Sequence, residues 1–318
     1  MRYARVRHEH SPDSEANEMA GLTFSRLDFG NFMQGLRKRA PHTVLSRAAS
    51  HLEVTRFVLM RVEEGSPTKL TTPQLESLLD FYEATPVDRA EALRLWAEIR
   101  EQDKTAKAQG NSKGFWKAYT DQVAPNFPKF LRLEGAADHI IAHQPVIVPG
   151  LFQIPDYRRA IVRIGEPELS VVDLERRLEL TAHRQARIED AGFRLEVFLS
   201  EAVLRNRAGS ASVMATQLRW LAEVGDRENV SVQVIPFSSG PHPGMTMHTF
   251  TMLRFPKGAS GMLLPPVVYA EGAIGSTFHE HEEEIGQYRQ AIDGLRTVAL
   301  TEGATRDLVA QVAKEYAS

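Results

Sequence analysis

The chain contains no cysteine, and this absence excludes several classes of site. Disulfide scaffolds, thiolate metal centres, iron–sulfur clusters and cysteine nucleophiles all need a residue that the 318-residue sequence lacks. The sequence also has no run of the roughly 18 apolar residues that a membrane-spanning helix needs, and its first residues include no apolar core of a secretion signal. We therefore expect a cytoplasmic protein with no membrane association.

The chain also lacks a large excess of charge of one sign, and it lacks the common nucleotide-binding motifs. The 38 basic and 41 acidic side chains give a net charge of −3, so any surface that attracts nucleic acid has to be local. No phosphate-binding loop, dinucleotide-binding glycine pattern or nucleophile elbow occurs. We expect no cofactor and assign no catalytic residue.

Length and patterning predict an α+β fold with two domains. The hydrophobic content of 42% and the charged content of 25% are ordinary for a globular protein. Residues 1–27 lack periodicity and are expected to form a disordered arm, and residues 28–100 have helical spacing throughout. Residues 101–114 contain no aliphatic residue larger than Ala and are expected to be a linker. Residues 115–318 mix helical and alternating patterns, which predicts an α/β domain.

Five short helices are predicted in residues 28–100, and the joint between the second and third is the most informative feature. The second helix ends near Leu52, and Thr55 is a candidate N-cap for a third helix that begins at Arg56. Only a tight turn fits between them. This arrangement is typical of a helix-turn-helix, which places its second helix in the major groove of DNA.

The third-helix string VTRFVLMRVEEG resembles the corresponding helix of the Cro/repressor-type regulators, the XRE class. The resemblance implies that Leu59 and Val62 belong to the core and that Glu63 ties the helix to a neighbour. It implies that the base-facing positions are Arg56, Phe57, Met60 and Arg61.

The sequence departs from that family's pattern in two ways. The turn normally has glycine where Glu53 stands, so we expect Glu53 at positive φ. Phe57 and Met60 are apolar on the expected reading face, where they fit either thymine methyl groups or the surface of another protein. Seven basic and three acidic residues in 37–69 make this region locally positive. The expected DNA-binding residues are Arg37, Lys38, Arg47, Thr55, Arg56, Phe57, Met60, Arg61 and Lys69.

The second half of the chain is predicted to contain a sheet of at least four strands. Alternating apolar residues indicate strands over 193–199, 230–236 and 247–255, with a fourth at 267–269. A helical segment separates the first two of these strands, which fits a parallel crossover unit. Earlier in the chain, spacing that includes Ile140 and Ile141 suggests a helix.

The string VPGLFQIPDYRRA (148–160) closely resembles a signature of an uncharacterised domain found in WhiJ-like, antitoxin-like regulators of actinobacteria. This resemblance covers nearly all of 115–316. It implies a regulator whose second domain senses an effector or binds a partner, often a small acidic protein encoded nearby. The positions carried over as partner- or ligand-binding are Gly150, Leu151, Gln153 and Tyr157.

Two groups of histidines and carboxylates suggest chemistry, and neither is compelling. His279 and Glu283 are four residues apart, but a helix capped by Thr277 explains that stretch better than a metal site, and no metal is expected. A hydrolase built from His242, His248 and Glu201 or Glu271 is not required by any spacing.

These observations favour a sequence-specific DNA-binding transcriptional regulator, expected to bind double-stranded DNA as a homodimer. The alternative is an antitoxin-like adaptor for protein interactions in which DNA reading has weakened.

Overall fold

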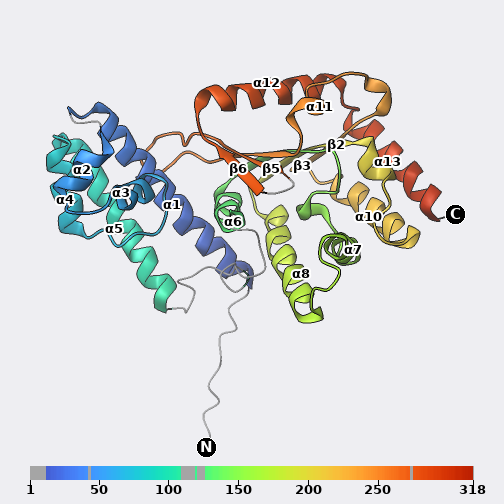
Figure 1. Ribbon diagram of the computed structural model, residues 1–318, viewed down its shortest axis with the longest axis horizontal. Coiled ribbons are helices and arrows are strands. Elements are labelled where there is room, and N and C mark those ends of the chain that lie inside the picture. Colours follow the sequence, from blue (N-terminus) through green and yellow to red (C-terminus); the bar gives the residue numbers. More distant parts are fainter. Residues whose placement is uncertain (1–11, 42–43, 109–118, 120–125, 273–274, 318) are drawn as a thin grey trace, which may run out of the picture. The chain divides into compact units, whose positions relative to one another are not determined.

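The computed structural model divides the chain into two compact units. Unit 1 comprises Met1–Phe115 with Pro256–Leu264, and unit 2 comprises Trp116–Phe255 with Pro265–Ser318. Residues 12–41, 44–108, 119, 126–272 and 275–317 are described, with the side chains of 12–22 left out. One unit is helical and the other contains a mixed sheet flanked by helices (Figure 1), so the predicted α+β class with two regions is confirmed.

Unit 1 contains five helices in its described part, as the spacing predicts. Helices α1 and α5 lie side by side, and α2 and α3 form the consecutive short pair (Figure 1). The core is made where these helices meet, and it includes Met33, Leu59, Leu75 and Leu79. The helices are α1 (Pro12–Arg39), α2 (Leu45–His51), α3 (Arg56–Glu63), α4 (Thr72–Phe81) and α5 (Pro86–Ala108).

The predicted arm and linker are both shorter than the sequence indicates. Residues 12–27 are the first part of α1, and residues 101–108 continue α5. Both stretches contain the strong helix formers Ala and Glu, and each helix gains further stability from packing on the other. Residues 1–11 and 109–114 lie outside the described residues.

The predicted domain boundary also misses a segment that returns to unit 1. Residues Pro256–Leu264 connect two strands of unit 2 but belong to unit 1. Met262 packs on the core of unit 1, and the buried Asp28 carboxylate accepts hydrogen bonds from the backbone N–H (2.8 Å) and the hydroxyl (2.5 Å) of Ser260. Tertiary contacts of this kind leave no local pattern in a sequence.

Unit 2 is built on a six-stranded sheet with the order β3-β2-β1-β4-β5-β6. The strands are β1 (His139–Gln144), β2 (Arg194–Ser200), β3 (Val230–Ile235), β4 (Phe250–Arg254), β5 (Val267–Gly272) and β6 (Gly275–His279). Strands β1, β2 and β3 are parallel, and β4, β5 and β6 are joined by antiparallel pairing. The predicted parallel crossover is confirmed, because α10 connects β2 to β3.

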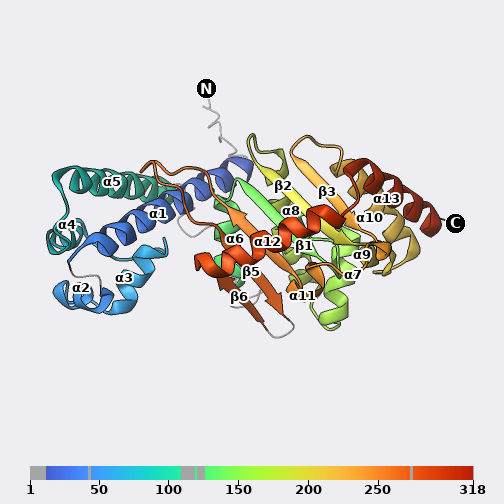
Figure 2. The same ribbon diagram turned by 90° about the horizontal axis from the view of Figure 1, so that it is seen from above.

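Helices cover both faces of this sheet. Helix α12 crosses one face, and α6, α7, α8 and α10 lie on the other (Figures 1 and 2). The α12 face buries a cluster that includes Ile141, Phe198, Phe250, Ile285 and Leu295. The α-helices are α6 (Phe127–Ala136), α7 (Pro155–Gly165), α8 (Val171–Gln185), α9 (Glu201–Arg205), α10 (Ala211–Val224), α11 (Gly244–Met247), α12 (Glu282–Val298) and α13 (Glu302–Ala317). Short 3-10 turns are η2 (Gly150–Phe152), η3 (Ala186–Glu189) and η4 (Phe237–Ser239).

Two sequence predictions in unit 2 are wrong. Residues Ile140 and Ile141 belong to strand β1 and not to a helix; β1 has neighbours on both sides and buries both of its faces, so the alternation that marks a half-buried strand is absent. Thr277 lies in strand β6, and the N-cap of α12 is His281. In the described part of the chain, no helix combines the length and apolar character needed to cross a membrane.

Candidate functional site

The turn between α2 and α3 adopts the geometry expected of a helix-turn-helix. The N–H of Val54 donates to the carbonyl of Ala49 (3.0 Å), which closes the end of α2 with a bond spanning five residues. Glu53 has φ of 54°, so the prediction of a left-handed residue at this position is confirmed. Thr55 occupies the N-cap position of α3, but its hydroxyl makes no capping hydrogen bond, contrary to expectation.

Helix α3 is held against α1 by a close backbone approach and an ion pair. A Cβ on Gly30 would lie 2.5 Å from the carbonyl oxygen of Val62, so only glycine allows this packing. The Arg37 guanidinium makes two bonds to the Glu63 carboxylate, Nε–Oε1 at 2.6 Å and Nη2–Oε2 at 2.8 Å. Glu63 therefore ties α3 to its neighbour as expected, and the hydrogen bonding that Arg37 donates to the Glu63 carboxylate raises the pKa of Arg37. The Arg37 side chain is 15% exposed and committed to this pair, so it must leave Glu63 before it can reach DNA.

The outward face of α3 and its surroundings remain open. Leu59 and Val62 are buried as expected, while Met60 is half-buried. Phe57 is 57% exposed. Among the predicted DNA-binding residues, the exposed ones are Lys38, Arg47, Thr55, Arg56, Phe57 and Lys69.

An apolar groove of about 580 Å³ lies beside the first turn of α3. It brings together three of the predicted residues, Phe57, Arg61 and Lys69, with apolar walls that include Val54 and Leu70. Arg61 is tethered within it: its guanidinium donates to the carbonyl of Pro67 (2.7 Å) and lies over the Phe57 ring (5.7 Å to the centroid). Arg61 must leave these contacts before it can reach a base.

The signature string of unit 2 forms a buried turn directly after β1. The Gln153 side chain donates to the carbonyl of Val148 (2.6 Å), and the Tyr157 hydroxyl accepts a hydrogen bond from the Val148 N–H (3.2 Å). Gln185 and Gln217 hold the same turn from α8 and α10 through its backbone. Tyr157 is 1% exposed and shapes the turn, whereas Gly150, Leu151 and Gln153 also line a pocket.

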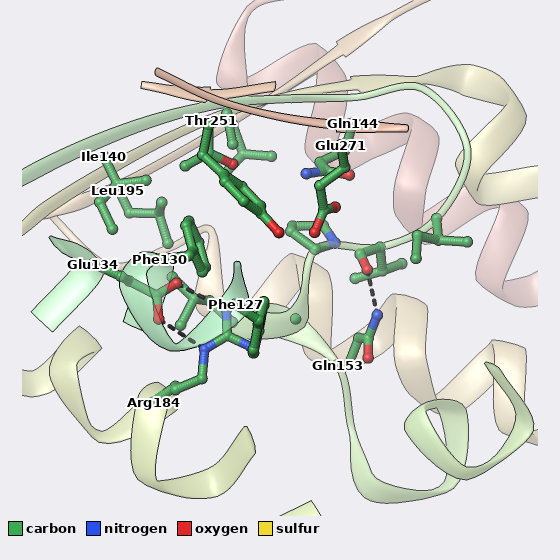
Figure 3. A pocket seen from close by; sticks show the side chains of 18 of the residues that line it. Phe127, Phe130, Glu134, Ile140, Gln144, Gln153, Arg184, Leu195, Thr251 and Glu271 are labelled. Carbon is green, nitrogen blue, oxygen red and sulfur yellow. Dashed lines mark hydrogen bonds and ion pairs between the residues drawn. The ribbon is translucent and has the colours of Figure 1, made fainter. Parts of the chain in front are cut away.

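This pocket has a volume of about 190 Å³ and lies between the sheet and the helices of the α6 face. Gln144 ends β1 and Glu271 lies near the end of β5; these two strands run in the same direction, so both side chains lie at the carboxyl edge of the sheet (Figure 3). Pockets at the carboxyl ends of parallel strands are the usual ligand sites of α/β sheets. Phe127, Phe130 and Leu195 supply apolar walls.

One ion pair in the pocket wall is complete. Arg184 donates to both carboxylate oxygens of Glu134, at 2.7 and 2.8 Å, and both side chains are almost fully buried (Figure 3). Burial alone would lower the pKa of Arg184, but the Glu134 carboxylate outweighs it and raises that pKa. Each of the two charges is therefore neutralised by the other and is not available to bind a charged ligand.

Three other polar groups of the pocket are not fully paired within the described residues. Among the described residues, the Arg158 side chain makes no hydrogen bond or ion pair, and its Nε is buried without a partner. Burial lowers the pKa of Arg158 to about 10, helped by repulsion from Arg184 and Arg177, so the guanidinium is still charged at neutral pH. Glu271 is exposed and forms no ion pair with a described residue. A side-chain hydrogen bond links Glu271 to Tyr269, and this bond and the Glu271 charge add to burial in raising the pKa of Tyr269 to about 12. The Oε1 atom of Gln153 is also buried without a partner.

The structure does not assemble the hydrolase considered from the sequence. Glu271 lines the pocket on the α6 face, whereas the loop of His242 and His248 carries α11, which packs on α12. Glu201 is engaged by the Phe237 N–H (2.9 Å) and by Arg205. No group of three potential ligands within the described residues can hold a metal ion, and His279 contacts Glu284 (3.3 Å) and not Glu283.

Sequence reasoning missed Arg158 and Arg184 as pocket residues. A signal exists for the first: Arg158 lies four residues before the buried Val162 on α7, so it sits on the inward stripe of that helix. For Arg184 no local signal exists, because its partner Glu134 lies fifty residues away.

The chain is an α+β protein, and its larger unit combines a mixed sheet, flanking helices and a pocket of about 190 Å³. Residues 127–311 match the family described as Domain of unknown function (DUF5753). This match covers more than half of the chain, which therefore belongs to that family. No curated protein and no solved structure matches the chain.

Proposed function

We propose that this protein is a sequence-specific DNA-binding transcriptional regulator that docks α2 and α3 on double-stranded DNA. One observation carries the proposal: a left-handed turn at Glu53 joins α2 to α3 and leaves Arg56 exposed at the start of α3. In helix-turn-helix proteins the first residues of the second helix contact base edges, and surrounding basic side chains contact phosphates.

The resemblance to the XRE class adds the form of the complex. Regulators of this class bind as dimers to two half-sites one helical turn apart, so a cytoplasmic homodimer is part of the proposal. Unit 2 then supplies the controlling contact with a partner protein or an effector.

The test is selection of duplexes from a random library by the full chain, followed by fluorescence anisotropy over a series of salt concentrations. Arg56→Ala is expected to weaken the selected site by about 1–3 kcal/mol, because Arg56 has no competing partner among the described residues. Arg61→Ala falls in the same range if Arg61 reads a base, and shallows the salt slope if it contacts a phosphate. Arg100→Ala, an exposed arginine on α5, is the control. Unchanged affinity in Arg56→Ala, Arg61→Ala and Lys38→Ala together contradicts the proposal.

The apolar groove favours a second candidate function, an antitoxin-like adaptor. A side chain as exposed as Phe57 beside a 580 Å³ apolar groove is typical of a surface that binds another protein. The partner implied by the resemblance is a small acidic protein, which suits the cations Arg61 and Lys69 in the groove wall. Phe57→Ser with Met60→Ser separates the two functions: loss of binding to that purified protein with retained DNA affinity supports the adaptor.

A further inference from the structure

The pocket of unit 2 contains one cation, Arg158, and one anion, Glu271, that form no ion pair with any described residue; Glu271 is hydrogen-bonded to the neutral Tyr269. Of the arginines near it, Arg184 is saturated by Glu134, and Arg177 makes two bonds to Glu166 at 2.6 and 2.9 Å. Arg158 has no such partner among the described residues. Glu271 likewise lines the pocket without an ion pair in that part of the chain.

The charges of Arg158 and Glu271 interact electrostatically but do not form an ion pair. Arg158 and Glu271 are not within the 4.0 Å of an ion pair, although the Glu271 carboxylate stabilises the charged guanidinium. Two opposite charges left apart in one pocket wall can each receive a group of the opposite sign from a ligand. The unpartnered Oε1 of Gln153 adds an acceptor for a ligand N–H group.

The rest of the pocket sets the size and polarity of the ligand. A volume of about 190 Å³ is below the roughly 300–1,000 Å³ of pockets for drug-sized ligands, which favours a small metabolite. Apolar side chains from α6, β1 and β2 form one end, away from Gln144 and Glu271 (Figure 3). The Phe130 ring, stacked on Tyr269 at 4.4 Å, makes that end an aromatic wall.

We infer that the pocket binds a small apolar α-amino acid as its zwitterion. Arg158 receives the carboxylate, Glu271 and the Gln153 Oε1 atom receive the ammonium group, and the side chain lies against Phe127 and Phe130. The binding site stands on the geometry of unit 2, while its role as the effector site of a regulator rests on the proposed function.

The experiment is isothermal titration calorimetry of the full chain with L-leucine and L-phenylalanine, in the absence of DNA. Each is compared with the analogue that lacks the ammonium group (4-methylpentanoate, 3-phenylpropanoate) and the one that lacks the carboxylate (3-methylbutylamine, 2-phenylethylamine). At least one zwitterion is expected to bind at least tenfold more tightly than both of its analogues. Equal binding of an acid or an amine, or no binding of any probe at millimolar concentration, overturns the inference.

Matched variants locate the binding on these side chains. Arg158→Gln and Glu271→Gln are each expected to weaken the zwitterion at least tenfold, whereas Arg159→Gln, on an arginine of α7 that pairs with Asp156 and Glu175, leaves it unchanged. Because Arg158 is an unpaired buried charge, Arg158→Gln is expected to raise the melting temperature of the unliganded protein; a purely structural arginine would lower it. Unchanged affinity in either pocket variant, or a lowered melting temperature for Arg158→Gln, counts against the inference. DNA binding is measured separately, so failure of the regulator proposal leaves this result intact.

Discussion

The face of α3 and the pocket of unit 2 are built in opposite ways. The α3 face takes its residues from a short stretch, 54–74, and leaves them exposed around an open groove. The pocket draws residues from 127 to 271 and surrounds them with completed pairs such as Arg184 with Glu134. A surface that meets a large partner needs only a rigid support behind it, whereas a pocket for a small ligand needs tertiary structure on every side.

This comparison predicts that the largest effect comes from the buried pair of unit 2. Arg184→Met leaves the Glu134 carboxylate, itself 5% exposed, without its partner, and we expect a loss of about 3–5 kcal/mol in the free energy of unfolding. Urea unfolding followed by peptide-resolved hydrogen exchange measures the loss and assigns it to unit 2. Arg159→Met, on a half-exposed pair, is expected to cost less than about 1 kcal/mol. The double variant Glu134→Leu with Arg184→Met should recover much of the loss, and a single variant as stable as wild type would show that the pair is not buried.

The corresponding weak point of unit 1 is Gly30. In Gly30→Ala the new Cβ meets two backbone carbonyl oxygens, of Val62 at 2.5 Å and Glu63 at 2.6 Å, which forces α1 and α3 apart at a cost of about 1–3 kcal/mol. Hydrogen exchange should rise in α3 and DNA affinity should fall, while amino-acid binding by unit 2 stays as it was. Gly35→Ala, whose Cβ meets only the Met262 Cε at 3.6 Å, is the matched control and is expected to be neutral or stabilising.

A pH titration of unfolding tests the buried histidines of unit 2. Burial lowers the pKa of His143, whose Nδ1 donates to the carbonyl of His248 at 2.7 Å. As the pH falls below about 6.5, the unfolded chain takes up a proton that folded unit 2 resists, so stability decreases with falling pH by at most about 1.4 kcal/mol per pH unit from this group. His143→Gln keeps a donor and should remove that share of the slope. Burial also lowers the pKa values of His139 and His242, so these two residues should still contribute their share of the slope in the variant. An identical slope in the variant would exclude His143 as a contributor.

The smallest expected effect is at the turn itself. Glu53 has φ of 54°, a conformation that costs a residue with a Cβ about 1 kcal/mol, so Glu53→Gly should stabilise unit 1 by up to that amount. Thermal unfolding followed by differential scanning calorimetry measures it. Glu64→Gly, at the α3 C-cap with φ of −79°, should give no such gain. Retained DNA affinity in Glu53→Gly is expected, and its loss would mean that the Glu53 side chain itself takes part.

Structural features were predictable where they depend only on residues that are neighbours in the sequence. The α2–α3 joint, the positive φ of Glu53 and the alternating strands β2 to β5 all follow from neighbouring residues. Strand β1 was mistaken for a helix because a strand buried on both faces has no alternation to detect. The pairing of Arg37 with Glu63 was not predictable for a related reason: a basic residue looks the same in a sequence whether it faces DNA or pairs with a glutamate twenty-six residues away.

By itself the sequence determined the helical first half, the helix-turn-helix joint, the parallel crossover and the absence of thiol chemistry, because helix and strand periods, turn residues and composition act over a few residues. Only the tertiary structure decided which charged side chains form ion pairs within the protein and which are available to a ligand. It pairs Arg37 with Glu63 and Arg184 with Glu134, and within the described residues it leaves Arg158 and Glu271 without an ion pair in one pocket. The physical reason is that the energy of a charge depends on its distance to every other charge and on its burial, and both are set by contacts between segments far apart in the chain.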